Sequence, residues 1–131
     1  MPRELTSHRV NGLNEALRIE VLDEPGNGGA CHEYRIVPIE LGTIPAECGI
    51  EERIGTFIGF QNGPIKEAGV NGISNEALLA IVEDRLVGFQ SGEYACDRNA
   101  SALFYVQNAM DHLAQRTLER VVRGVEGTNK K

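Results

Sequence analysis

Hydrophobic and polar positions alternate along the first half of the chain. The alternation runs through residues 16–23 and 34–41, where apolar positions such as Leu17 and Val21 are separated by even numbers of residues. A period of two is typical of strands that bury one face. Residues 24–29, between the two runs, are rich in Gly and Asn, which tolerate the positive φ angles of tight turns. This pattern predicts a β-hairpin.

A third strand is expected at residues 54–61, which are rich in Ile and Phe. Pro64 follows it and ends it, because proline has no N–H group to donate to a neighbouring strand. For the same reason, Pro38 favours an edge position for the second strand of the hairpin. The first half of the chain therefore predicts a small antiparallel β-sheet.

The second half repeats its hydrophobic positions with the period of a helix. Ser74 can cap a first helix over about residues 75–89, and a second helix over about residues 97–123 is stopped by Gly124. The expected buried side of the first helix comprises Leu78, Leu79, Val82, Leu86 and Phe89. That of the second comprises Leu103, Val106, Met110, Leu113, Thr117 and Val121. The short connection between them predicts an antiparallel helical hairpin.

These elements define an α+β fold, in which a small N-terminal antiparallel β-sheet precedes a C-terminal antiparallel helical hairpin. A chain of 131 residues has the size of one domain. We therefore expect a single domain, with a β-rich part at residues 1–72, the hairpin at 73–124 and a C-terminal tail at 125–131.

Charge is distributed unevenly along the chain. The net charge is -6, but residues 1–97 hold 7 basic and 16 acidic side chains (-9), whereas residues 98–131 hold 6 basic and 3 acidic ones (+3). Such an acidic protein is not expected to bind polymeric nucleic acid, and no apolar run reaches the roughly 18 residues of a membrane span. The odd set of Cys31, Cys48 and Cys96 favours free thiols in a reducing cytoplasm. Any anion-binding surface should involve the C-terminal quarter.

The signatures of common enzymes are missing from the sequence. It has no Gly-x-Ser-x-Gly elbow, no Walker loop and no His-Glu-x-x-His pair. His8, His32 and His112 do not have the spacing of metal ligands, and neither do the cysteines, so surface histidines and structural thiols are expected. We therefore expect no catalytic residue, no metal and no cofactor.

The outward side of the second helix is a candidate binding surface. The residues that gather there are Tyr105, His112, Arg116, Arg120 and Arg123. Arginine side chains can grip phosphates through two N–H groups at once, but a solvated helix surface explains the same pattern. Phe89 leaves a similar choice between a core residue and a platform for stacking a base.

Four segments of the chain carry a more specific signal. They are Phe60 to Glu67 with Gly69 to Gly72, Phe89 to Cys96, Asn99-Ala100, and Arg116 to Thr128. Together they resemble the Thoeris anti-defence sponges of phages, over about residues 59–128. Tyr94 stands where this family commonly has Phe. Residues 1 to about 50 lie outside the resemblance.

The resemblance implies a sponge, which binds a nucleotide signal without changing it. Such proteins sequester cyclic ADP-ribose isomers, such as glycocyclic ADP-ribose, that TIR-domain enzymes make in the cytoplasm of the infected bacterium. Anti-CBASS sponges that share the hairpin also capture cyclic di- or trinucleotides in separate pockets of the oligomer. The implied ligand residues are Phe89 on the adenine, Asn99 on polar edges, and Arg116 with Arg120 on the diphosphate. Tyr105, Arg123 and Asn62 are further ligand-binding candidates.

The length of the second helix bears on assembly. Asn99 and Arg116 are 17 residues apart, which is about 26 Å along a helix and longer than one nucleotide. A pocket that uses both ends needs two antiparallel hairpins, so we expect a homodimer with two shared sites, and the family implies a hexamer.

Two rival interpretations of the function stay open. One is a phosphodiesterase that degrades the signal, with Glu119 as the acid nearest the arginines; the other is an interaction protein with a merely solvated arginine surface.

Overall fold

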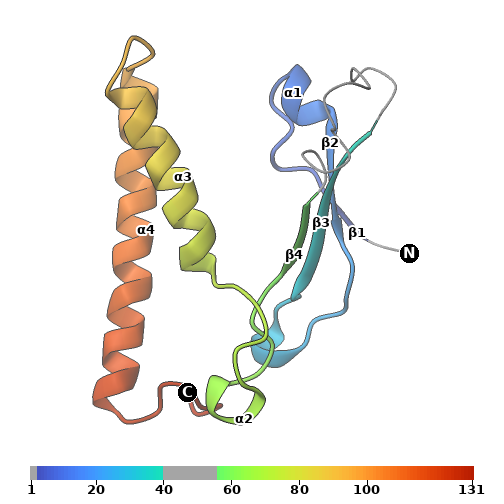
Figure 1. Ribbon diagram of the computed structural model, residues 1–131, viewed down its shortest axis with the longest axis vertical. Helices are drawn as coiled ribbons and strands as arrows, with labels where there is room; N and C mark the ends of the chain where they lie inside the picture. The colour runs from blue at the N-terminus through green and yellow to red at the C-terminus, as the bar shows by residue number, and fades with distance from the viewer. Residues whose placement is uncertain (1–2, 40–55) are drawn as a thin grey trace. The chain divides into compact units, whose positions relative to one another are not determined.

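The computed structural model describes residues 3–39 and 56–131. It confirms the α+β fold, because a four-stranded antiparallel sheet is followed by helices that include a C-terminal pair (Figure 1). The chain forms two compact units, which cover residues 1–62 and 63–131. The expectation of a single domain stays a prediction.

The first unit is built around a sheet with the strand order β1-β2-β3-β4, in which all neighbours are antiparallel. The strands span Arg3–Leu5 (β1), Leu17–Val21 (β2), Glu33–Pro38 (β3) and Thr56–Gly59 (β4). The short helix α1, Gly12–Glu15, precedes β2, and the 3-10 turn η1, Asn27–Gly29, lies between β2 and β3. The predicted hairpin and third strand are confirmed, whereas β1 and α1 are too short to leave a readable pattern.

The register of the strands places the apolar side chains of β2 and β3 on one face. Val21 pairs with Tyr34, and at 2% exposure it is the one buried hydrophobic residue among those the structure describes. The opposite face carries charge, as Arg35 Nη2 lies 2.8 Å from Glu20 Oε1 across the same two strands. The alternation therefore marks strands that bury one face, as predicted, and this face packs toward a small core.

The edge position expected from Pro38 is wrong, because β3 lies between β2 and β4. Proline is tolerated there because Pro38 is the last residue of β3, and the described part of β4 pairs only as far as Ile36. The outer ends of the second and third predicted strands, residues 40–41 and 54–55, lie outside the described residues.

The second unit begins with the short helix α2, Ile65–Ala68, and continues into the hairpin of α3, Asn75–Gln90, and α4, Asp97–Val122 (Figure 1). Ser74 caps α3 as predicted, because its Oγ accepts a hydrogen bond from the backbone N–H of Ala77 at 3.1 Å. Cys96 caps α4 in the same way through Sγ, which accepts from the N–H of Asn99 at 3.4 Å. None of the helices among the described residues has the length and apolarity needed to cross a membrane.

Half-buried side chains mark where α3 and α4 pack against each other. They are Leu78, Leu79 and Leu86 on α3, and Leu103, Val106, Met110 and Leu113 on α4. Thr117 and Val121, expected on the same buried side, are exposed. The reason is length, since α4 has 26 residues and α3 has 16, so about 15 Å of α4 extends beyond α3. Val82 and Phe89 are also exposed.

Candidate functional site

The connection between α3 and α4 brings two predicted site residues to the same end of the hairpin. Phe89 lies in the last turn of α3 and is 42% exposed, while Asn99 lies in the first turn of α4 and is half-buried. Gln90 Oε1 accepts a hydrogen bond from the backbone N–H of Cys96 at 3.0 Å and ties the connection down. The exposure of Phe89 favours a platform for a ligand over a core residue.

A further cation lies beside this aromatic ring. The guanidinium carbon of Arg85 is 5.5 Å from the ring centroid of Phe89, within the range of a cation–π interaction. Arg85 is absent from the sequence prediction because it does not belong to any segment of the resemblance. The available signal was its position four residues before Phe89, which puts both side chains on one face of α3.

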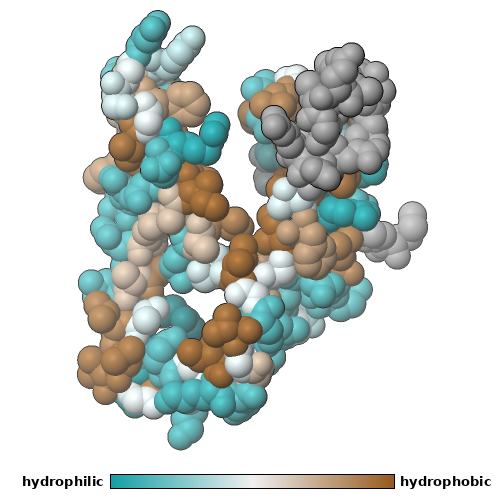
Figure 2. Space-filling view, viewed as in Figure 1, coloured by the Kyte–Doolittle hydropathy of each residue, from teal (hydrophilic) through white to brown (hydrophobic). Residues whose placement is uncertain are grey.

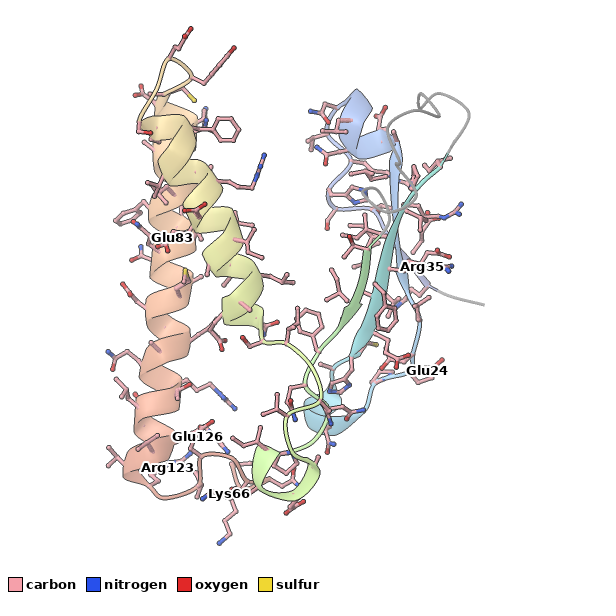
Figure 3. The ribbon with its side chains drawn as sticks, viewed as in Figure 1. Glu24, Arg35, Lys66, Glu83, Arg123 and Glu126 are labelled. Carbon is pink, nitrogen blue, oxygen red and sulfur yellow. The ribbon has the colours of Figure 1, made fainter. Side chains whose placement is uncertain are left out.

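The other end of the hairpin holds the arginines near the end of α4. Arg116 and Arg123 are exposed, and neither makes an ion pair within the described part of the chain. Figure 3 labels Arg123 at the lower end of α4, close to Glu126. Two of the three expected arginines are therefore free to meet an anion.

Arg120 is different, and the expectation that it lies on the outward, exposed side of α4 is wrong. It is only 8% exposed, and its guanidinium donates four hydrogen bonds within the chain. Nε donates to Glu126 Oε2 at 3.0 Å, Nη1 to the carbonyl of Lys130 at 2.7 Å, and Nη2 to the carbonyls of Val125 and Thr128 at 2.9 and 3.0 Å. Its fork of donors is used to hold the C-terminal tail.

The tail can reach Arg120 because α4 ends in a Schellman motif. Gly124 has a φ of 72°, its N–H donates to the carbonyl of Val121 at 3.0 Å, and the next N–H, of Val125, donates to the carbonyl of Arg120 at 3.0 Å. This turn reverses the chain, so residues 125–130 fold back over the last turn of the helix. Gly124 thus ends the helix as predicted. It also directs the tail back over the helix, which periodicity does not indicate.

The folded-back tail also contacts α2. The backbone N–H of Lys66 donates to the carbonyl of Gly127 at 3.3 Å. Gly127 has a φ of 79°, and a Cβ at this position would lie 3.3 Å from Ile65 Cγ1 and from Lys66 Cγ. Figure 3 shows Lys66 and Glu126 near each other at this end of the hairpin. Two segments of the resemblance, residues 60–72 and 116–128, therefore meet in space.

An open surface depression of about 670 Å³ lies beside the last turns of α4, and it is lined by one face of that helix alone. Its lining residues are Gln115, Leu118, Glu119, Val122 and Arg123. The apolar members are exposed, with Val122 at 86%, and Figure 2 shows an apolar patch over the lower end of α4. Exposed apolar surface next to a cation is typical of a surface that binds a ligand or a partner.

One of the two remaining candidates lies in the middle of α4, and the other lies in the first unit. Tyr105 is exposed along α4, with its ring edge-to-face against Phe104 at a centroid distance of 5.5 Å. Asn62 belongs to the first unit, where its Oδ1 accepts a hydrogen bond from Asn27 Nδ2 at 3.2 Å. Their ligand-binding roles stay predictions.

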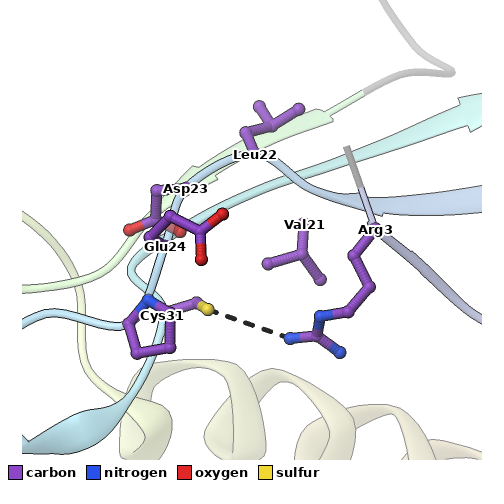
Figure 4. A pocket seen from close by; sticks show the side chains of 7 residues that line it. Arg3, Val21, Leu22, Asp23, Glu24 and Cys31 are labelled. Carbon is purple, nitrogen blue, oxygen red and sulfur yellow. Dashed lines mark hydrogen bonds between the residues drawn. The ribbon is translucent and has the colours of Figure 1, made fainter. Parts of the chain in front are cut away.

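The sheet unit has a pocket of its own, of about 470 Å³, lined in part by Arg3, Asp23 and Cys31 (Figure 4). Arg3 Nη2 lies 3.8 Å from Cys31 Sγ. Desolvation raises the pKa of Asp23, but hydrogen bonds from the backbone N–H groups of His32 and Glu33 and the nearby His32 ring outweigh it, so its pKa lies below the usual value. Asp23 therefore acts mainly as a brace for the loop before β3.

Histidine and cysteine placement corrects one expectation and confirms another. His32 is buried and not on the surface, because its ring packs beside Gly26 and Asp23. Cys31 and Cys96 are free thiols as expected, while Cys48 lies outside the described residues. In residues 3–39 and 56–131, no group of three or more His, Cys, Asp or Glu side chains is arranged to hold a metal ion.

Comparison with known proteins bears on the hairpin above all. A family model described as the Acb2/Tad1 hairpin domain matches residues 52–117, which include all of α3 and most of α4. Thoeris anti-defense 1 of Bacillus phage SBSphiJ7 is 47% identical over 74 residues, 56% of this chain and 52% of that protein. The chain therefore spans about half the length of this curated relative. Because the family match takes in half of the chain, and contains the first three of the four segments, the protein belongs to the Acb2/Tad1 hairpin-domain family.

Proposed function

We propose that the protein is a non-catalytic sponge, which captures cyclic ADP-ribose isomers such as glycocyclic ADP-ribose and so blocks Thoeris defence in the cytoplasm of a phage-infected bacterium. The observation that carries this proposal is the 47% identity to a protein named Thoeris anti-defense 1. Sequestration requires tight binding and no bond cleavage, which suits a surface made of an aromatic ring and arginines.

The proposed contacts use exposed and half-buried residues at the two ends of the hairpin. Phe89 stacks on the adenine, Asn99 bonds its polar edges, and Arg116 holds the diphosphate with Arg123 nearby. Arg120 is left out of this contact set, because its guanidinium already donates four hydrogen bonds to the tail. Its proposed part is indirect, since it fixes the end of the helix that carries Arg116.

A site built from both ends requires two protomers. The 17 residues between Asn99 and Arg116 span about 26 Å of helix, so one hairpin cannot close around a single nucleotide with both. We therefore propose a homodimer with two shared sites, which can assemble further into a hexamer. Exposed apolar side chains support this, because the helices of the described hairpin bury no hydrophobic residue fully, and Leu118, Val121 and Val122 are exposed.

The fate of the ligand tests the proposal. Purified protein is mixed with a substoichiometric amount of glycocyclic ADP-ribose, the free pool is separated by ultrafiltration, and the retained fraction is then heated. A sponge removes the nucleotide from the free pool and returns it chemically intact on denaturation. A linear or hydrolysed product would identify a phosphodiesterase instead, and an undiminished free pool would favour an interaction protein. Cyclic di- and trinucleotides are the second ligand class for the same assay.

A further inference from the structure

The aromatic residue of the proposed site has a cation on one side of its ring. Arg85 and Phe89 are four residues apart on α3, and the guanidinium carbon lies 5.5 Å from the ring centroid. A planar guanidinium near an aromatic ring keeps its N–H groups at its edges, where they can still donate hydrogen bonds. Phe89 remains 42% exposed, so the ring still offers surface to a base.

The N–H groups of Arg85 are not used within the described chain. Arg85 is exposed and has neither an ion pair nor a hydrogen bond with any residue in 3–39 or 56–131. The acids that precede it, Glu83 and Asp84, are two positions and one position away, a spacing that does not bring helical side chains face to face. This contrasts with Arg120, whose donors are taken by the tail.

A nucleotide presents a flat base and a phosphate a short distance apart. An aromatic ring and a free guanidinium within about one helical turn, roughly 5.4 Å, offer a matching pair of groups. We propose that Arg85 is a phosphate-binding residue of the same site, supplied by the protomer that supplies Phe89. This inference rests on the proposed function and deepens it, because it places base and phosphate recognition together at the turn end of one hairpin.

A role for Arg85 changes how the shared site is divided between protomers. The turn end of one hairpin then recognises the nucleotide through Phe89, Asn99 and Arg85, and Arg116 of a second copy adds a further interaction with the diphosphate. The affinity for the nucleotide should therefore fall when either Arg85 or Arg116 is substituted, and fall further when both are, because each contributes part of the phosphate recognition.

Substitution of Arg85 by Gln removes the charge and keeps much of the side-chain length. Arg98 is a matched control, since it is also an exposed arginine at the turn end of the hairpin, and Arg98→Gln makes the same change in net charge. Glycocyclic ADP-ribose is titrated by calorimetry into the wild type and both variants, with a melting curve for each. We expect Arg85→Gln to weaken binding by about ten-fold or more, as for the removal of a charge-assisted hydrogen bond, with an unchanged melting temperature. Arg98→Gln should bind as the wild type does.

Salt dependence distinguishes phosphate binding from a structural role of Arg85. The affinity of the wild type should fall more steeply with added salt than that of Arg85→Gln, and Arg85→Lys should restore part of this dependence. Equal affinity in wild type and Arg85→Gln would overturn the role of Arg85 and leave the proposed function standing. Equal salt dependence in the two would also overturn it. Absence of binding by the wild type would overturn the proposed function and this inference together.

Discussion

Arg120 on α4 and Glu126 in the C-terminal tail form an ion pair, with Nε 3.0 Å from Oε2, and the same guanidinium bonds three backbone carbonyls of the tail. The arginine side chain is about 10% exposed and the glutamate about 41%, so the guanidinium is the buried partner. Stabilisation is expected to come mainly from the three carbonyl hydrogen bonds, because the half-exposed glutamate is screened by solvent. Arg120 thus stabilises the end of the hairpin from inside.

Arg120→Ala should destabilise the protein by about 2 to 4 kcal/mol, because three tail carbonyls no longer have their donor. Arg120→Lys should recover little of this, since an ammonium does not reproduce the planar fork. Urea denaturation measures the loss, with Arg116→Ala as an exposed control. A free energy of unfolding equal to that of the wild type would contradict the anchoring role.

Arg116→Ala should have the opposite profile, with weaker ligand binding and an unchanged fold. Removing one charged partner from a desolvated pocket costs about 2 to 5 kcal/mol, which corresponds to a roughly 30-fold or larger drop in affinity. Stability should change by only about 0.5 kcal/mol, as for ordinary surface positions. Calorimetric titration with glycocyclic ADP-ribose, run beside thermal melts, measures both. If this variant binds with wild-type affinity, Arg116 belongs to a solvated surface and not to the binding site.

The two arginines show how far sequence reasoning can go. Periodicity correctly predicts both helices, the caps at Ser74 and Gly124, and the exposure of Arg116. Periodicity also gives Arg120 an outward position, because a helical wheel describes only the helix. The wheel contains no information on residues 125–130, which fold back over α4 after the Schellman turn at Gly124.

Other differences have equally local causes. The buried side predicted for α4 ends early because α3 is ten residues shorter (26 against 16), a length difference that a single-helix pattern does not take into account. Arg85 is absent from the sequence prediction for two reasons. It lies outside every segment of the resemblance, and a hydrophobic pattern treats its polar position and the apolar position of Phe89 separately. The predicted ligand roles are untested for every candidate: Phe89, Asn99, Arg116, Arg120, Arg123, Tyr105 and Asn62.

Assembly should depend on the exposed apolar end of α4. Light scattering of the wild type is expected to give at least a dimer. Val122→Glu places a charge in the proposed interface and should shift the equilibrium toward monomers, because an unpaired charge is costly to bury. Val10→Glu makes the same change at an exposed valine of the first unit and should leave the mass unchanged. A wild-type monomer that still binds the nucleotide tightly would show that the site is not shared.

Acid should destabilise the sheet unit through Asp23. Its pKa in the folded protein lies below the ordinary value of 3.8, because backbone N–H groups bond its carboxylate despite desolvation. The unfolded chain then binds more protons than the folded one, so the contribution of Asp23 is complete above about pH 4 to 5 and is lost as the pH falls through the lowered pKa. Urea denaturation at about pH 5 and about pH 3, on either side of the ordinary pKa, should show a larger loss for the wild type than for Asp23→Asn. An equal loss of unfolding free energy in the wild type and in Asp23→Asn would contradict this role of Asp23.

Sequestration means that the protein holds a cyclic nucleotide without changing it. The most direct test is mass spectrometry of the nucleotides released by heat from protein purified out of bacteria whose TIR-domain enzymes are active. We predict an intact cyclic ADP-ribose isomer in near-stoichiometric amount, and its disappearance from protein carrying Arg116→Ala. Release of no nucleotide, or of a hydrolysed product alone, would contradict sequestration.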